Sequence, residues 1–436
     1  MLKTSHQIPD ETFSGSPASN HTPSASPQDV SKIVLALMLS VFATMLGIGI
    51  VAPLLPMYAA WKGASRLEVG LIFASFPLSR MLFAPLAGHW ADRYNRKRLI
   101  LIGLLIYIVC SLAYCLTISP YPLSGIRFCQ GMGSTLVIPV AMAIMGELAP
   151  PGKTGSFMGL INLALMGGIS LGPFLGGMFM DLWGMNSVFI ALGFCTLVGF
   201  MFCLTLLPRD QLGGSNSIRT VPQPADSSGT YGSLLANRAF RGIFLSRFAI
   251  SMCYSAVWAF LPLFASEKLR QSPTKIGLLL TMNVMIAALM SSPVGRLADR
   301  FNRRHLILIG IGFLIWSFEF LVLATGFNDL VWSNVLMGLS GGFVIPPLMA
   351  IVTEVGREQR AMGRAMSLVE LGMSGGFAFG PLLTGWLIRE AGYPHAFGVM
   401  IVIAFLALVI FMALVTEPRL LERQKVLSDK PDQEVS

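Results

Sequence analysis

The sequence predicts an all-α membrane protein with twelve transmembrane helices, arranged in two pseudo-symmetric bundles of six. Hydrophobic residues make up 54% of the 436-residue chain and charged residues only 12%, about half of the roughly 25% that is typical of soluble proteins. Twelve apolar runs each approach the roughly 20 residues that a helix needs to cross a bilayer. A short sequence after the second run recurs after the eighth, so the two halves of the chain are related.

The predicted spans are joined by short loops within each half and by one longer linker between the halves. They cover residues 33–57, 68–88, 98–118, 121–146, 155–180, 187–207, 240–265, 274–295, 305–326, 330–353, 363–388 and 394–415. Many contain Gly and Pro, which a membrane bundle tolerates. Residues 1–31 have no apolar segment ahead of a cleavage site, so they are predicted to be a disordered cytoplasmic tail and not a signal peptide. The two bundles then cover 32–207 and 239–416, with a polar cytoplasmic linker at 208–238 and a second cytoplasmic tail at 417–436.

The distribution of Lys and Arg predicts the orientation of the spans. Of the 31 basic residues, 22 lie in the termini and in the loops on the same side, 6 lie on the opposite side and 3 lie within spans. Because positive charge concentrates on the cytoplasmic side of membrane proteins, we expect both termini to be cytoplasmic and the protein to lie in a plasma membrane, such as a bacterial inner membrane. The same distribution accounts for the net charge of +9 without a nucleic-acid partner.

Two internal repeats relate the halves. The loop after the second span reads GHWADRYNRK from Gly88, and the loop after the eighth reads GRLADRFNRR from Gly295, an offset of 207 residues. A Gly-x-x-x-Gly-Pro sequence in the fifth span recurs 208 residues later in the eleventh; its residues are Gly168, Gly172 and Pro173, and Gly376, Gly380 and Pro381. Parallel repeats of this kind place a solute path between the halves, near the middle of the membrane.

Over residues 33–415 these motifs resemble the major facilitator superfamily. The two loops resemble its motif A, with matching residues Gly88, Asp92, Arg93 and Arg96 in one half and Gly295, Asp299, Arg300 and Arg303 in the other. Arg127 and the residues after it resemble motif B, and the glycine spacing of the fifth span resembles antiporter motif C. The first span resembles that of twelve-helix drug:proton antiporters. The chain departs from the family pattern at Asn95 and Asn302, where the family has Gly, and at Trp90, where it has Leu.

The resemblance implies a gating role for the motif A loops. In the family the loop carboxylate faces a helix N-terminus of the opposite half, where the helix dipole favours an anion. Asp92 would then contact the start of the eleventh span and Asp299 the start of the fifth, closing the cytoplasmic side. The alternative is that these charged loops only fix the topology.

Glycine stripes mark the fifth and eleventh spans. The fifth span has glycines at intervals of four residues, at Gly168, Gly172 and Gly176. The eleventh span has the same spacing, at Gly372, Gly376 and Gly380. Each helix therefore has a face without side chains, which permits close contact with another helix. Pro173 and Pro381 are expected to kink these helices. Because the family places both helices between the halves, we interpret the stripes as a moving seam; static packing is the alternative.

Five charged residues lie inside predicted spans, where charges are costly and usually functional: Arg80, Arg127, Arg247, Glu319 and Glu370. By resemblance, Arg127 lines the cavity and assists proton coupling, although an internal hydrogen-bonding role is the alternative. Spans 2 and 11 are neighbours in the family, so we hypothesise that Arg80 pairs with Glu370 and that protonation of Glu370 weakens the pair. Glu319 is the second candidate for the proton site, and Arg247 is expected to extend to the cytoplasm.

Together these features predict a secondary transporter that moves a small organic solute by alternating access, with proton-coupled efflux as the first choice and an importer or facilitator of one metabolite as the alternative. The glycine that a phosphate-binding loop needs is Glu147 here, and no enzyme motif is present. We therefore expect no catalytic activity, no metal and no cofactor beyond a proton gradient. The expected partners are the solute, protons and lipid, with the protein acting as a monomer. The sequence does not name the solute.

Overall fold

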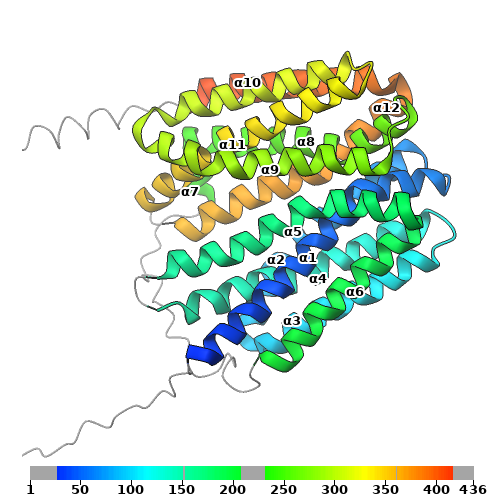
Figure 1. Ribbon diagram of the computed structural model, residues 1–436. Helices are drawn as coiled ribbons and strands as arrows, with labels where there is room; N and C mark the ends of the chain where they lie inside the picture. The colour runs from blue at the N-terminus through cyan, green and yellow to red at the C-terminus, as the bar shows by residue number, and fades with distance from the viewer. Residues whose placement is uncertain (1–26, 151–152, 208–230, 360, 416–436) are drawn as a thin grey trace, which may run out of the picture.

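The computed structural model describes residues 27–150, 153–207, 231–359 and 361–415, apart from the side chains of residues 27–29, 88, 92 and 154. Every regular element in these ranges is a helix (Figure 1). The helices are α1 (Pro27–Trp61), α2 (Arg66–Arg93), α3 (Arg96–Leu116), α4 (Tyr121–Leu148), α5 (Thr154–Trp183), α6 (Met185–Leu206), α7 (Tyr231–Ala236), α8 (Arg238–Glu267), α9 (Pro273–Arg300), α10 (Arg303–Val322), α11 (Phe327–Glu358) and α12 (Met362–Leu414).

Helix α12 contains two of the twelve predicted spans. This helix of 53 residues is interrupted at Gly392, which has a φ of 82°. Glycine adopts such a positive φ at little energetic cost because it has no side chain. The chain reverses there, because the segment after Gly392 runs antiparallel to α8: Cys253 donates to the carbonyl of Met400, and Ser246 to that of Ala407. With α12 counted as two helices, the eleven long apolar helices in the described part of the chain provide twelve spans, which confirms the predicted fold class.

Two predicted boundaries are wrong. Helix α1 begins at Pro27, so the last residues of the predicted tail 1–31 are helical; a proline suits the first turn of a helix. Within the predicted linker 208–238, residues 231–236 form α7, which buries Leu234 against the second bundle. The remaining parts of the predicted tails and linker lie outside the described residues.

The helices form two groups. In Figure 1, α1–α6 make the lower group and α7–α12 the upper group. Within the first group α1 packs against α5 and α6, and within the second α8 packs against both segments of α12. The groups meet mainly along two helix pairs, which we name the α5–α9 seam and the α2–α12 seam, and α1 also contacts α8. The two seams are the most extensive contacts between the halves.

The two ends of the bundle differ in what they contain. The described chain ends at Pro27 and Val415 lie at one end with the loops at 94–95 and 301–302; we name this end the terminal face. The loops at 62–65 and 268–272 and the break at Gly392 lie at the opposite end, the distal face. All positions along the seams are described below relative to these two faces.

Candidate functional site

The α5–α9 seam is closed near the distal face by direct backbone contact. A Cβ added at Gly177 would overlap the carbonyl oxygen of Pro273, and one at Gly277 would overlap that of Pro173. Only glycine permits this separation of the two backbones, as in other closely packed membrane helices. The halves therefore touch here without intervening side chains.

The α2–α12 seam repeats this geometry. A Cβ at Gly70 would overlap the carbonyl oxygen of Pro381, and one at Gly385 would overlap that of Arg66. Gly70 and Gly277 are related by the 207-residue offset, and Gly177 and Gly385 by the 208-residue offset. The sequence analysis did not assign these four glycines to a contact between the halves, although the repeat offsets were sufficient to relate them.

The predicted glycine stripes do not form the seams, which corrects the moving-seam interpretation. In α5, a Cβ at Gly168 would lie 2.7 Å from the carbonyl oxygen of Phe42, and one at Gly172 would lie 2.6 Å from Gly49, both in α1 of the same half. Gly176 likewise faces α1, while Gly376 and Gly380 face α8. Consecutive helical residues point about 100° apart, so the stripe faces its own half while Gly177 faces the other. The stripes serve static packing, and only Pro173 and Pro381 lie on the seams.

One side chain crosses the α5–α9 seam beside Pro173. The hydroxyl of Thr281 in α9 donates to the carbonyl of Ser170, 2.7 Å away, and accepts from the N–H of Phe174 at 3.2 Å. Ser170 and Phe174 are an i, i+4 pair, the two ends of one α-helical hydrogen bond. A hydroxyl from one half thus takes part in the backbone ladder of the other.

A charged pair crosses the α2–α12 seam further towards the terminal face. Arg80 Nη2 lies 3.7 Å from Glu370 Oε1, and the side chains are 30% and 50% exposed. The predicted pairing of these residues is therefore present in the structure. Arg247 of α8 also interacts electrostatically with Glu370. The structure contradicts the expectation that Arg247 extends to the cytoplasm, because it is 6% exposed and its Nη2 lies 2.8 Å from the sulfur of Met373.

The other two intramembrane charges lie away from this pair. Arg127 is 2% exposed, donates from Nη1 to Gln130 at 2.9 Å and lies 4.9 Å from the ring centroid of Phe76. This is the internal hydrogen bond that was the alternative reading, and a role for Arg127 in proton coupling stays a prediction. Glu319 is exposed in the last turn of α10, near the distal face and away from both seams, so Glu370 is the stronger candidate for a proton site.

The motif A arginines bond within their own halves. Arg303 donates from Nη1 to Glu354 at 2.9 Å and from Nε to the carbonyl of Ala298 at 3.3 Å. In the first half Arg96 makes the same two contacts, with Glu147 and the carbonyl of Ala91. Arg93 and Arg300 end α2 and α9, where a cation complements the helix dipole. These bonds fix each loop to the end of the neighbouring α4 or α11.

The predicted contacts between motif A and the opposite half are not formed where the structure describes them. Asp299 is exposed, and its carboxylate has no ion pair or hydrogen bond within the described ranges. A Cβ at Gly295 would meet no atom within 4 Å. The side chains at Gly88 and Asp92 lie outside the described residues. The gating roles of both loops therefore stay predictions for a conformation in which the terminal face is closed.

At the distal face an acid does contact a helix N-terminus of the other half. The carboxylate of Asp181, at the end of α5, accepts from the N–H of Thr274 at 2.8 Å and also from its hydroxyl. Thr274 is the second residue of α9, where the helix dipole attracts an anion. The type of contact expected for motif A thus occurs at the opposite end of the molecule.

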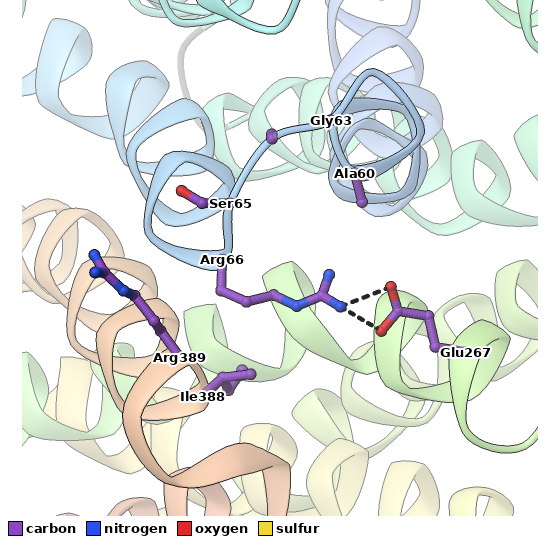
Figure 2. Close-up of a pocket in the computed structure, with 8 residues that line it drawn as sticks. Ala60, Gly63, Ser65, Arg66, Glu267, Ile388 and Arg389 are labelled. Carbon is purple, nitrogen blue, oxygen red and sulfur yellow. Dashed lines mark hydrogen bonds and ion pairs between the residues drawn. The ribbon is translucent and has the colours of Figure 1, made fainter.

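An ion pair closes the other side of the distal face (Figure 2). Arg66 of α2 donates to both oxygens of Glu267 of α8, at 2.9 and 2.7 Å, and Tyr393 donates to Glu267 at 3.0 Å. Beside this pair lies an open cavity of about 540 Å³ that Ile388 and Arg389 also line. We name Arg66, Glu267, Asp181 and Thr274 the distal gate. None of the four was singled out from the sequence, because each lacks a counterpart in the other half.

Towards the terminal face the α5–α9 seam opens. In the closed part of the seam, α5 and α9 run antiparallel and Pro173 lies opposite Gly277. The same register places Met166 opposite Met285, yet both of these side chains are exposed. Further along, Gly155 of α5 and Gly295 of α9 have open space around them. Along this seam the halves are therefore in contact near the distal face and further apart near the terminal face.

Comparison with known families and proteins agrees with this geometry. A family model described as Major Facilitator Superfamily matches residues 37–270 and 243–433. An uncharacterised transporter of this type from Methanocaldococcus jannaschii is 29% identical over 68% of the chain and 75% of its own length. Multidrug resistance protein 2 of Bacillus subtilis is 24% identical over 86% of the chain and 94% of its own length. Quinolone resistance protein NorA of Staphylococcus aureus is 24% identical, with 82% and 90% covered.

Solved structures share the fold at lower identity. A bacterial homologue of the human lysosomal transporter Spinster, in an inward-facing and occupied conformation, superposes with a TM-score of 0.73 at 15% identity, covering 94% of the chain and all of that protein. The nucleoside transporter NupG superposes with a TM-score of 0.71 at 14% identity, covering 88% of the chain and all of NupG. These matches support the arrangement of the helices alone.

Proposed function

The chain belongs to the major facilitator superfamily, and from this premise we propose that it exports a small organic solute in exchange for protons. Transport proceeds by alternating access, with the two halves rocking about the path between them. The terminal face is cytoplasmic and the distal face is external, because 22 of the 31 basic residues lie in segments on the terminal side. The structure then has the arrangement of an inward-facing state.

The contact between Arg80 and Glu370 carries the proposal. It joins the two halves across the α2–α12 seam, on the terminal side of the backbone contacts at Gly70 and Gly385, and both side chains are partly exposed. An ionised Glu370 attracts Arg80, whereas a protonated Glu370 does not, so the proton load of this carboxyl changes the attraction between the halves. In the inward-facing state Glu370 releases its proton to the cytoplasm, and the solute binds. In the outward-facing state it takes up a proton as the solute leaves.

The relatives support export. Two of the curated proteins that the chain resembles over more than four-fifths of its length are named for resistance to drugs. We extend that property to this chain as a proposal, with one protein molecule as the functional unit, the proton gradient as the energy source and the plasma membrane as the location. Neither half has a soluble domain that would supply another energy source among the described residues.

Inverted membrane vesicles test the direction and the driving force together. We expect vesicles that contain the protein to accumulate an amphipathic organic solute when their lumen is made acidic, and to lose it when a protonophore is added. A panel of dyes, siderophores and amphipathic metabolites would identify the solute. Vesicles without the protein, and vesicles with Arg241→Gln at an exposed site on α8, are the controls. Uptake that is indifferent to the pH gradient would instead indicate a facilitator, and uptake driven by an alkaline lumen a proton-coupled importer.

A further inference from the structure

The two seams are not chemically equivalent, although the repeat relates them. The Thr281 hydroxyl in the α5–α9 seam has Ala74 as its counterpart in α2, at the 207-residue offset. The Arg80–Glu370 pair of the α2–α12 seam has Ala287 and Asn162 as its counterparts. Apart from the Asp181–Thr274 contact at the distal face, each seam thus contains one polar contact that the other lacks, titratable in one case and neutral in the other.

The hydroxyl of Thr281 sits at the weakest point of α5. Pro173 has no N–H, so α5 lacks one backbone hydrogen bond there, and the next N–H along the chain is that of Phe174. A hydroxyl that enters the ladder beside a proline is a recognised cause of a helix kink. The two bonds to Ser170 and Phe174 use both the donor and the acceptor capacity of the hydroxyl.

The position of this contact ties it to closure of the distal face. It lies about one helical turn from the backbone contact between Gly277 and Pro173. When the distal face opens, α9 must move away from α5 at this level, and the Thr281 hydroxyl leaves the ladder.

We propose that Thr281 is a positioning residue for transport: its hydroxyl holds α9 against α5 beside Pro173 while the distal face is closed, and both hydrogen bonds are lost when the distal face opens. The proposal rests on the alternating-access function proposed above. The two hydrogen bonds exist in only one of the two states, so they shift the balance towards the inward-facing state. Solute access at the terminal face is thereby coupled to one contact between the two bundles.

Two substitutions separate the hydroxyl from the rest of the side chain. Thr281→Val keeps the shape and removes both hydrogen bonds, whereas Thr281→Ser keeps the hydroxyl and removes a methyl group. Ser291→Ala is the matched control, because Ser291 is also in α9 but bonds the Ala287 carbonyl of its own helix at 2.7 Å. Spin labels at Gly155 and Arg296, both exposed near the terminal face, report the separation of α5 and α9 in the purified full-length protein.

For the unsubstituted protein and for Thr281→Ser we expect the long label separation of the inward-facing state. For Thr281→Val we expect the ratio of inward-facing to outward-facing molecules to fall by about fivefold to tenfold, the effect of losing one or two hydrogen bonds. Ser291→Ala should resemble the unsubstituted protein.

Two results would overturn the proposal. One is a Thr281→Val distribution that matches those of the unsubstituted protein and Ser291→Ala. The other is an equal shift in Thr281→Val and Thr281→Ser, which would assign the effect to packing and not to the hydroxyl. The distance measurement needs neither solute nor proton gradient. If Thr281→Val shifts the distances but the protein fails the vesicle assay, proton-coupled export is refuted and this inference is not. If the protein passes the vesicle assay but Thr281→Val leaves the distances unchanged, this inference is refuted and proton-coupled export is not.

Discussion

Glu370 is the one carboxylate among the described residues that lies on a seam between the halves and within the interior of the predicted spans. It has Arg80 on one side, across the α2–α12 seam, and Arg247 of its own half on the other. A buried cation such as Arg247 needs a nearby anion, so Glu370 has a structural role as well as the proposed proton-carrying one. The two roles predict different results for a neutral substitution that keeps the shape of the side chain.

Glu370→Gln should abolish proton-driven accumulation in inverted vesicles, because an amide cannot exchange a proton with the gradient. Exchange of labelled for unlabelled solute needs no proton and should persist. Glu390→Gln is the control, since Glu390 is exposed and its contact with Arg389 is of the surface type that contributes little. Accumulation by Glu370→Gln at the normal rate would show that this carboxyl does not carry the proton. Loss of exchange as well would point to the structural role.

Asp181 is the residue at which removal of one carboxylate should open the distal face. Asp181→Ala removes two hydrogen bonds to Thr274 and an anion at the N-terminus of α9, at a cost of about 1–2 kcal/mol to the inward-facing state. Spin labels at Trp61 and Lys268, at the distal ends of α1 and α8, should show more molecules with a long separation. Asp181→Asn, which keeps an acceptor but no charge, should give an intermediate result. If Asp181→Ala and the unsubstituted protein gave the same distribution of label distances, Asp181 would not be part of the gate.

At the scale of helices, the glycines of the seams have a clearer mechanical role than those of the stripes. Gly277→Ala places a methyl group against the carbonyl oxygen of Pro173, a backbone atom that moves only if a whole helix moves. Overlap of this kind costs about 1–3 kcal/mol. We expect Gly277→Ala to hold the distal face open and to slow transport. Gly312→Ala in α10, where a Cβ meets no atom within 4 Å, should change neither the closure of the distal face nor the rate of transport. Normal transport by Gly277→Ala would show that the seam does not need direct backbone contact.

The stripes show where prediction from sequence reaches its limit for a helix. The spacing of Gly168, Gly172 and Gly176 correctly identified a bare face on α5, but spacing does not say which neighbour covers that face. Gly177, only one residue further, points in a different direction and forms the seam. The helices were predictable because apolar length and composition are local properties. The partner of a helix face depends on packing with residues far along the chain, and there the resemblance to a family was a misleading guide.

At the scale of the whole molecule, the repeat determined which contacts could be predicted. Arg303 and Arg96 make the same two bonds in the two halves, and the repeat located both. The Arg80–Glu370 pair was accessible because each residue is an unusual charge within an apolar run. Thr281 and Asp181 are ordinary residues for their positions and have no counterpart in the other half. Their importance arises only from contact with the opposite half, which the sequence does not display.

In the proposed alternating-access cycle the halves move as bodies about the path between them. A cross-link across the distal gate should therefore stop transport while leaving the terminal face open. Cysteines at Asp181 and Thr274, whose side chains touch, can be joined by a short cross-linker that a reductant cleaves. The six native cysteines are free and must first be replaced.

We expect the cross-linked protein to bind solute from the terminal side but not to transport it, because the distal face cannot open. Cleavage of the cross-linker should restore transport. Protein with the Thr274→Cys substitution alone, treated in the same way, is the control for the chemistry. If the cross-linked protein carried solute at the rate of the cleaved protein, the path would not pass between the halves at the distal gate, and rocking of two bundles would no longer explain transport.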